Sequence, residues 1–142
     1  MKTLRSVLES KGGEIYSVGP TASVFDALEE MSKRDVGALI VLDGGEVVGI
    51  FSERDYARKI ILVGKSSRET PVSEIMTSRV VFARPDLTLE ECLALMTDKR
   101  IRHLPVIQND ELIGVVSIGD LVKGIIDDQR FLISQLESYV SG

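Results

Sequence analysis

Cysteine and histidine are almost absent from this chain. Its 142 residues include one cysteine, Cys92, and one histidine, His103. A single cysteine excludes a disulfide within the chain, and one residue of each kind leaves no Cys/His cluster for a structural zinc ion. Because Cys92 lies in an apolar pattern of helical spacing, we expect it to be a buried structural thiol.

Positive charge and long apolar runs are scarce as well. The chain has 17 Lys and Arg against 22 Asp and Glu, a formal net charge of −5 at pH 7. This balance argues against general nucleic-acid binding, which needs clustered cations. No stretch approaches the roughly 20 apolar residues that span a bilayer, and the first residues lack the apolar core of a secretory signal. We therefore expect a cytoplasmic protein with no nucleic-acid or membrane partner.

What the sequence does contain is an internal repeat. Residues 20–58 realign on residues 85–123 at a constant offset and without a gap. The identical positions include turn, cap and core residues: Pro20/Pro85, Leu28/Leu93, Met31/Met96, Leu39/Leu104, Val41/Val106, Glu46/Glu111, Gly49/Gly114, Ser52/Ser117 and Asp55/Asp120. Such self-similarity indicates two copies of one supersecondary unit.

Each copy predicts the order strand, helix, strand, strand, helix. An extended run is followed by a helix that opens with a capping box, at Ser23 or Thr88. Two apolar runs then flank a hairpin turn, and a second helix starts at Ser52 or Ser117. A unit this small cannot bury both faces of its sheet alone. We therefore expect an α+β fold of two βαββα repeats packed pseudo-symmetrically through their sheets.

The expected boundaries divide the chain into three parts. Residues 1–66 hold an N-terminal helix and the first repeat, residues 67–126 the second repeat, and residues 127–142 a C-terminal amphipathic helix. Apolar side chains at helical spacing form a stripe on that last helix. Two roles stay open for it: it caps the module itself, or it forms a dimer contact.

One seven-residue pattern closes both hairpins. Gly49–Asp55 and Gly114–Asp120 each consist of Gly, two apolar residues, Ser, two variable residues and Asp. The Ser stands where a strand ends and a helix begins. The unpaired amides and the positive end of the helix dipole at that point form a potential binding site for a phosphate. The Asp carboxylate, one turn on, can accept hydrogen bonds from both hydroxyls of a ribose. The alternative is a plain helix cap, because Ser-x-x-Asp is also a capping pattern.

These motifs and the phrases around them, IFSERDYARK, EIMT, KRIRHLPV and VVSIGDLVK, resemble CBS repeats. The resemblance runs from about Glu14 to Lys123, and it is to small bacterial proteins made of two such repeats, a Bateman module. It implies that Asp55 and Asp120 hold ribose diols in two clefts between the repeats. It also implies that Thr77 and Val80 lie along the adenine, and that two modules form a flat homodimer.

Basic residues near the motif differ between the repeats. In the second repeat Arg102 and His103 enter the central strand, where the resemblance implies contact with the phosphates; alternatively, His103 is a hydrogen-bonded core residue. The first repeat lacks basic residues at the matching positions. It carries Arg54 and Arg58 instead, which either reach a phosphate or belong to a solvated surface. We therefore expect unequal clefts, with tighter phosphate binding in the cleft that uses Asp120.

The function these residues favour is a regulatory adenine-nucleotide-binding module. Its ligand would be AMP, ADP, ATP or NAD(H), and it would act in trans as an energy or redox sensor on an unknown protein. The alternative is a ligand-independent interaction scaffold. An enzyme is disfavoured, because His103 is the only neutral-pH base and no Ser or Cys nucleophile is placed beside it. We expect no catalytic residue, no catalytic cofactor and no metal.

Overall fold

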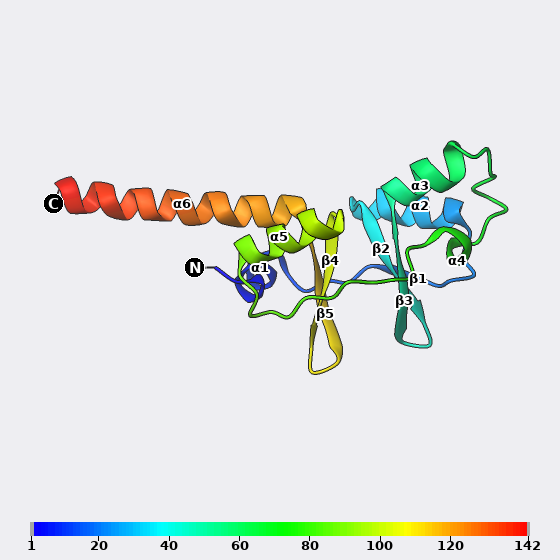
Figure 1. Cartoon of the computed structure of the whole chain (residues 1–142), viewed down its shortest axis with the longest axis horizontal. Helices are drawn as coiled ribbons and strands as arrows, with labels where there is room; N and C mark the ends of the chain where they lie inside the picture. Colours follow the sequence, from blue (N-terminus) through cyan, green and yellow to red (C-terminus); the bar gives the residue numbers. More distant parts are fainter. Residues whose placement is uncertain (1, 142) are drawn as a thin grey trace. The chain divides into compact units, whose positions relative to one another are not determined.

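The computed structural model describes residues 2–141 (Figure 1). The chain divides into two compact units. The first-repeat unit comprises Ile15–Val80, and the second-repeat unit comprises the residues up to Glu14 together with those from Val81 on. Each unit combines helices with its own small sheet, which confirms the predicted α+β class.

The first-repeat unit is built on a three-stranded sheet in the order β1-β2-β3. Its elements are β1 (Ser17–Val18), α2 (Val24–Arg34), β2 (Ala38–Asp43), β3 (Glu46–Ser52), α3 (Glu53–Tyr56), a π-helical segment (Ala57–Ile61) and α4 (Val72–Ile75). Strand β2 pairs with β1 in parallel and with β3 antiparallel. Helix α2 begins at Ser23 as predicted, but only half of the expected capping box forms among the described residues: the Ser23 hydroxyl accepts a hydrogen bond from the Asp26 amide, without the reciprocal bond from the Ser23 amide to Asp26.

The second-repeat unit is built on a two-stranded hairpin. Its elements are α1 (Leu4–Lys11), α5 (Leu89–Lys99), β4 (His103–Gln108), β5 (Glu111–Ser117) and α6 (Ile118–Ser141). Strands β4 and β5 are antiparallel. The extended run predicted before the first helix of this repeat, residues 80–83, forms only one parallel bridge, between Ala83 and Val106. Helix α5 opens with the full predicted capping box, in which Thr88 and Glu91 each accept the other's amide hydrogen.

Each unit has an apolar core of its own. The core of the first-repeat unit consists of Val24, Ala27, Met31, Leu39, Val41, Phe51, Ile60, Val72 and Ile75. In the second-repeat unit the core consists of Leu4, Val7, Leu8, Ala83, Leu89, Cys92, Met96, Leu104, Val106, Val116 and Leu121. Cys92 is buried as expected, and burial raises the pKa of its thiol to about 11. The reactive thiolate is therefore disfavoured at neutral pH.

Helix α1 packs in the second-repeat unit, whereas the expected boundaries grouped it with the first repeat. Its residues Leu4, Val7 and Leu8 are at most 7% exposed and belong to the core beneath β5. Helix α4, which precedes the second repeat in the chain, packs against β3 of the first. Each hairpin is thus covered by a helix from outside its own repeat, a partner choice that repeat periodicity does not reveal.

Helix α6 is one continuous helix of 24 residues, without the expected boundary near residue 127. Its first turns are anchored by buried Leu121, and its C-terminal half extends beyond the other elements of the second-repeat unit (Figure 1). The apolar side chains of that half, Phe131, Leu132, Ile133, Leu136, Tyr139 and Val140, are 55–86% exposed. No helix within residues 2–141 is long and apolar enough to cross a membrane.

Candidate ligand-binding site

The two Ser-x-x-Asp motifs lie at strand–helix junctions, as predicted. In the first, the Ser52 amide donates to Asp55 Oδ2 at 3.0 Å, and the Asp55 amide donates to Ser52 Oγ at 3.2 Å. In the second, the Ser117 amide donates to Asp120 Oδ2 at 2.9 Å, and the Asp120 amide donates to Ser117 Oγ at 3.1 Å. Both motifs therefore act as helix caps. A cap uses only Oδ2 of each carboxylate, so the surroundings of Oδ1 decide what else the residue can do.

Asp55 has both of its carboxylate oxygens occupied by the protein. Its Oδ1 accepts a hydrogen bond from Thr77 Oγ1 at 3.3 Å and lies 3.2 Å from Lys59 Nζ. The Asp55 side chain is only 9% exposed. Lys59 also donates to the carbonyl of Ile75 at 3.0 Å, which ties the junction to α4. Both oxygens of the Asp55 carboxylate are therefore used by contacts within the first-repeat unit.

Asp120 is more open. Its side chain is 25% exposed, and within residues 2–141 no hydrogen bond to Oδ1 is present. Lys11 Nζ donates to Oδ2 at 2.7 Å and to the Val115 carbonyl at 2.9 Å. Partial burial alone would raise the pKa of Asp120, but hydrogen bonds from Lys11 and Ser117 outweigh it and hold that pKa below its ordinary value of 3.8. A charged acceptor with a spare oxygen thus stands at the start of α6.

Arg102 and His103 lie beside this junction. The amide of Ile118, the first residue of α6, donates to the Arg102 carbonyl at 3.0 Å, and His103 is the register partner of Ser117. Arg102 is exposed, whereas His103 is only partly so. Burial lowers the pKa of His103 below 6.5, against the opposing charge of Asp120, so its neutral form is favoured. The structure therefore brings Arg102, His103, Ser117 and Asp120 together, as the sequence predicted.

The other predicted site residues belong to the first-repeat unit. Arg54 and Arg58 are both exposed; Arg54 lies in α3, and Arg58 lies in the π-helical segment that follows it. Thr77 contacts Asp55 through its hydroxyl, and its backbone pairs with Ile50. Val80 is partly buried.

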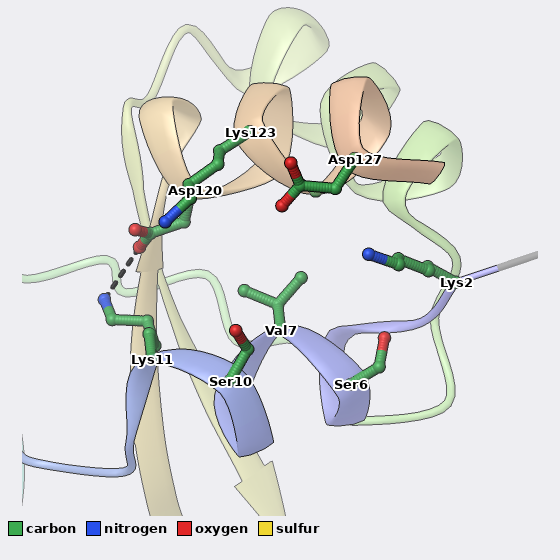
Figure 2. A pocket seen from close by; sticks show the side chains of 9 residues that line it. Lys2, Ser6, Val7, Ser10, Lys11, Asp120, Lys123 and Asp127 are labelled. Atoms are coloured by element: carbon green, nitrogen blue, oxygen red, sulfur yellow. Dashed lines mark hydrogen bonds and ion pairs between the residues drawn. The ribbon is translucent and has the colours of Figure 1, made fainter. Parts of the chain in front are cut away.

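Sequence reasoning missed the two lysines that contact the motif carboxylates. Lys59 follows Asp55 by four residues, a spacing that indicates an ion pair on a helix. Lys11 precedes Asp120 by more than 100 residues, so nothing in the local sequence connects them. Figure 2 shows Lys11 beside Asp120 at one end of a cavity of about 100 Å³ between α1 and α6. The cavity is lined by Lys2, Ser6, Val7, Ser10, Lys11, Asp120, Lys123, Gly124 and Asp127.

The glycine that opens each motif has a packing role. A Cβ at Gly114 would lie 2.6 Å from Leu8 Cδ2 of α1, and one at Gly49 would lie 2.6 Å from Met76 Sδ, just after α4. Both distances are too short for a side chain. The glycine therefore lets a covering helix approach the hairpin.

The comparison with protein families decides the identity of the repeats. The model of the CBS domain matches residues 10–62 and 72–127. The chain belongs to the CBS-domain family. It is 40% identical over 149 residues to the CBS domain-containing protein CBSX3, mitochondrial, of Arabidopsis thaliana, covering 99% of this chain and 72% of that one. A solved CBS-domain protein of Burkholderia ambifaria is 46% identical, with a TM-score of 0.87 over 90% of this chain and 96% of the other.

Two further CBS structures show what related folds do. The CBS pair of protein MJ0100 was solved in complex with 5′-methylthioadenosine and S-adenosyl-L-methionine; at 21% identity and a TM-score of 0.77, with 90% and 98% coverage, it shares the fold. A CBS-CP12 protein of bloom-forming cyanobacteria, 28% identical with a TM-score of 0.77, is hexameric; the match covers 86% of this chain and 70% of that one. The predicted CBS pair is thus confirmed, whereas its predicted homodimer stays a prediction.

Proposed function

We propose that this CBS pair is a non-catalytic regulatory module that binds an adenine nucleotide at the Asp120 junction. The observation that carries the proposal is the difference between the two motif carboxylates. Both cap a helix, but Asp55 has its second oxygen occupied and is buried, whereas Asp120 is partly exposed with Oδ1 open to an incoming donor. The opening gives a ligand an acceptor that the Asp55 junction does not offer.

The ribose of the ligand would donate its hydroxyl hydrogens to Asp120. Lys11 and the Ser117 amide keep the Asp120 carboxylate ionised. It is therefore a strong acceptor, because hydrogen bonds to a charged group are stronger than those between neutral groups. Oδ2 already accepts from Lys11 and the Ser117 amide, so the hydroxyls of the ribose would donate to the two lone pairs of Oδ1.

The phosphate of the ligand would lie between the start of α6 and Arg102. The dipole of this 24-residue helix places positive potential at its first turn, although the amides of Ile118 and Asp120 are already paired with the Arg102 carbonyl and Ser117 Oγ. Arg102 is exposed at the same junction and provides a planar cation for phosphate oxygens. Neutral His103 can donate one further hydrogen bond without adding charge.

The adenosine-bearing ligands of MJ0100 support this class of ligand without naming the one bound here. AMP, ADP, ATP and NAD(H) all contain the adenosine unit that Asp120 would recognise, and we keep all of them as candidates. The predicted ligand contacts of Thr77, Val80, Arg54 and Arg58 stay predictions.

Calorimetric titration with AMP, ADP, ATP and NAD⁺ tests the proposal. Asp120→Asn should weaken binding about tenfold or more, because a charged hydrogen bond contributes about 1.5–3 kcal/mol. Asp110→Asn is a matched control: it removes the same charge at the far end of the hairpin, in a left-handed turn position that Asn tolerates. Unchanged affinity in Asp120→Asn, with a lowered melting temperature, would show that the motif is only a cap.

The second candidate function is a ligand-independent interaction scaffold, favoured by the exposed apolar side chains of α6. The same titration separates the two functions. If none of the four nucleotides binds the wild-type protein, the scaffold becomes the better interpretation.

A further inference from the structure

Two side chains of the first-repeat unit, Lys59 and Thr77, cover the Asp55 carboxylate; we call them the closing pair. Thr77 Oγ1 lies 3.3 Å from Asp55 Oδ1, and Lys59 Nζ lies 3.2 Å from the same oxygen. Lys59 is held in place by a second bond, to the carbonyl of Ile75 at 3.0 Å. The helix cap uses Oδ2, which accepts from the amide and the hydroxyl of Ser52. The closing pair therefore occupies only the oxygen that the cap does not use.

The second repeat has glycine at both corresponding positions. The constant offset that aligns the two repeats sets Lys59 against Gly124 and Thr77 against Gly12. Neither glycine has a side chain that could donate to a carboxylate, and in the part of the chain that the structure describes no donor contacts Asp120 Oδ1. The cation at this junction comes from α1 and contacts Oδ2 instead. The open oxygen of Asp120 thus coincides with the loss of both members of the closing pair.

The packing of α1 favours glycine at both positions. Gly12 ends α1 with a φ of +96°, a conformation that residues with a side chain rarely adopt. A Cβ at Gly124 would lie 2.8 Å from Leu89 Cδ1 and 3.4 Å from Val7 Cγ2 of α1. Leu89 is only 1% exposed, so it has little room to move aside. The docking of α1 in the second-repeat unit therefore disfavours a closing pair beside Asp120.

We propose that Lys59 and Thr77 determine how many nucleotides the chain binds, because they keep the ribose acceptor of the first repeat closed. The inference rests on the proposed function at Asp120 and extends it to the first motif. The hydroxyls of a ribose are neutral donors, whereas a hydrogen bond from an ammonium to a carboxylate is stronger. A ribose therefore does not displace Lys59 from Oδ1 of Asp55. At Asp120 the described residues leave Oδ1 without a competing donor.

The rest of the ribose-binding arrangement is already present at the first motif. The cap formed by Ser52 and Asp55 has the same two reciprocal bonds as the cap formed by Ser117 and Asp120. The Lys59 side chain is 45% exposed and lies outside the apolar core of its unit. Removing the closing pair should therefore uncover a second ribose acceptor and leave the core intact.

Titration calorimetry of the double variant Lys59→Ala/Thr77→Ala with AMP, ADP, ATP and NAD⁺ tests the proposal. The wild type should bind one nucleotide per chain, and the double variant should bind two. The new site should be weaker than the first by about tenfold or more, because Gly37 stands where the second repeat has Arg102 as a cation for the phosphate. Circular dichroism checks that the variant is folded. Lys59→Ala alone removes the charged competitor and should also show a second site, so it serves if the double variant does not fold.

Lys65→Ala is the matched control. Lys65 belongs to the same unit, its side chain is 49% exposed, and it lies 3.8 Å from Glu74, away from the motif carboxylate. The control removes the same charge and should keep one site with the wild-type affinity. A second site in Lys65→Ala would show that the new binding does not depend on an opened Oδ1, and it would overturn the proposal.

A third substitution locates the new site. Asp55→Asn added to the double variant should remove the second site and leave the first at its wild-type affinity, whereas Asp120→Asn added instead should weaken only the tight site. A folded double variant that still binds one nucleotide would overturn the role of the closing pair and leave the proposed function intact. A wild type that binds none of the four nucleotides would contradict the proposed function, and this inference with it.

Discussion

Asp55 and Asp120 occupy the same place in two copies of one motif, yet their chemistry differs because their neighbours differ. Lys59 approaches Asp55 from the next helical turn and, with Thr77, occupies its second oxygen. Lys11 approaches Asp120 from α1 and shares the oxygen already used by the cap. The two motifs therefore differ as candidate ligand sites, because the neighbours of Asp55 occupy its Oδ1 and those of Asp120 leave its Oδ1 open.

His103 makes the free energy of unfolding depend on pH. Burial lowers its pKa in the folded state below the ordinary value of 6.5. As pH falls below about 6.5, the unfolded chain takes up this proton first, so stability declines until pH reaches the lower folded-state pKa. The slope for one proton is at most about 1.4 kcal/mol per pH unit. His103→Gln should flatten the curve in this window, as measured by urea denaturation.

The depressed pKa of Asp120 acts in a separate and more acidic window. Its stabilising effect is complete above the ordinary carboxyl value of 3.8 and is lost as pH falls through the lower folded-state value. A variant curve parallel to the wild-type curve from pH 7 to 5 would contradict the assignment to His103.

At the scale of elements, the helices that cover the hairpins determine which glycines are required. A Cβ at Gly49 would lie 2.6 Å from Met76 Sδ and 3.0 Å from the Thr77 carbonyl oxygen. The second of these atoms is backbone and cannot move aside cheaply. The approach of the segment after α4 to β3 therefore depends on this glycine.

Gly49→Ala should destabilise the protein by about 1–3 kcal/mol, the usual cost of overpacking. Gly119→Ala is the control, because a Cβ there would meet only Ser117 Oγ at 3.6 Å. Alanine within α6 should even add up to about 1 kcal/mol through helix propensity. Thermal unfolding of the two variants measures both effects, and equal melting temperatures would refute the close approach.

At the scale of the whole molecule, the two repeats should bind unequally. The Asp120 junction has an open oxygen, an exposed Arg102 and the start of a long helix, whereas the Asp55 junction is closed by its own unit. The basic residues predict tighter phosphate binding beside Asp120 than beside Asp55, and the contacts of the two carboxylates support the same difference.

We therefore expect one tight nucleotide site per chain. Asp55→Asn should lower stability by about 1–3 kcal/mol, because a buried acceptor of several hydrogen bonds is replaced by a group that also carries donors. It should leave the affinity of the tight site within about twofold of the wild-type value. Two equal sites in calorimetry, or loss of the tight site in Asp55→Asn, would show that the repeats are equivalent.

The sequence by itself determined the repeat, the order of its elements and the capping residues. These features are local: Ser23, Thr88 and the Ser-x-x-Asp motifs specify helix starts through bonds that span only three residues. It also placed Arg102, His103, Ser117 and Asp120 together, because hairpin register aligns His103 with Ser117 across two adjacent strands.

Only the tertiary structure decided which helix covers which hairpin and which carboxylate stays open. Helix α1 packs on the second repeat although it precedes the first, so Lys11 reaches Asp120 across more than 100 residues. Periodicity shows that Leu4, Val7 and Leu8 share an apolar face, but apolar burial is non-directional and does not name the partner surface. The same holds for α6. The spacing of its residues predicts an apolar stripe, but it does not predict that the side chains of the stripe are exposed.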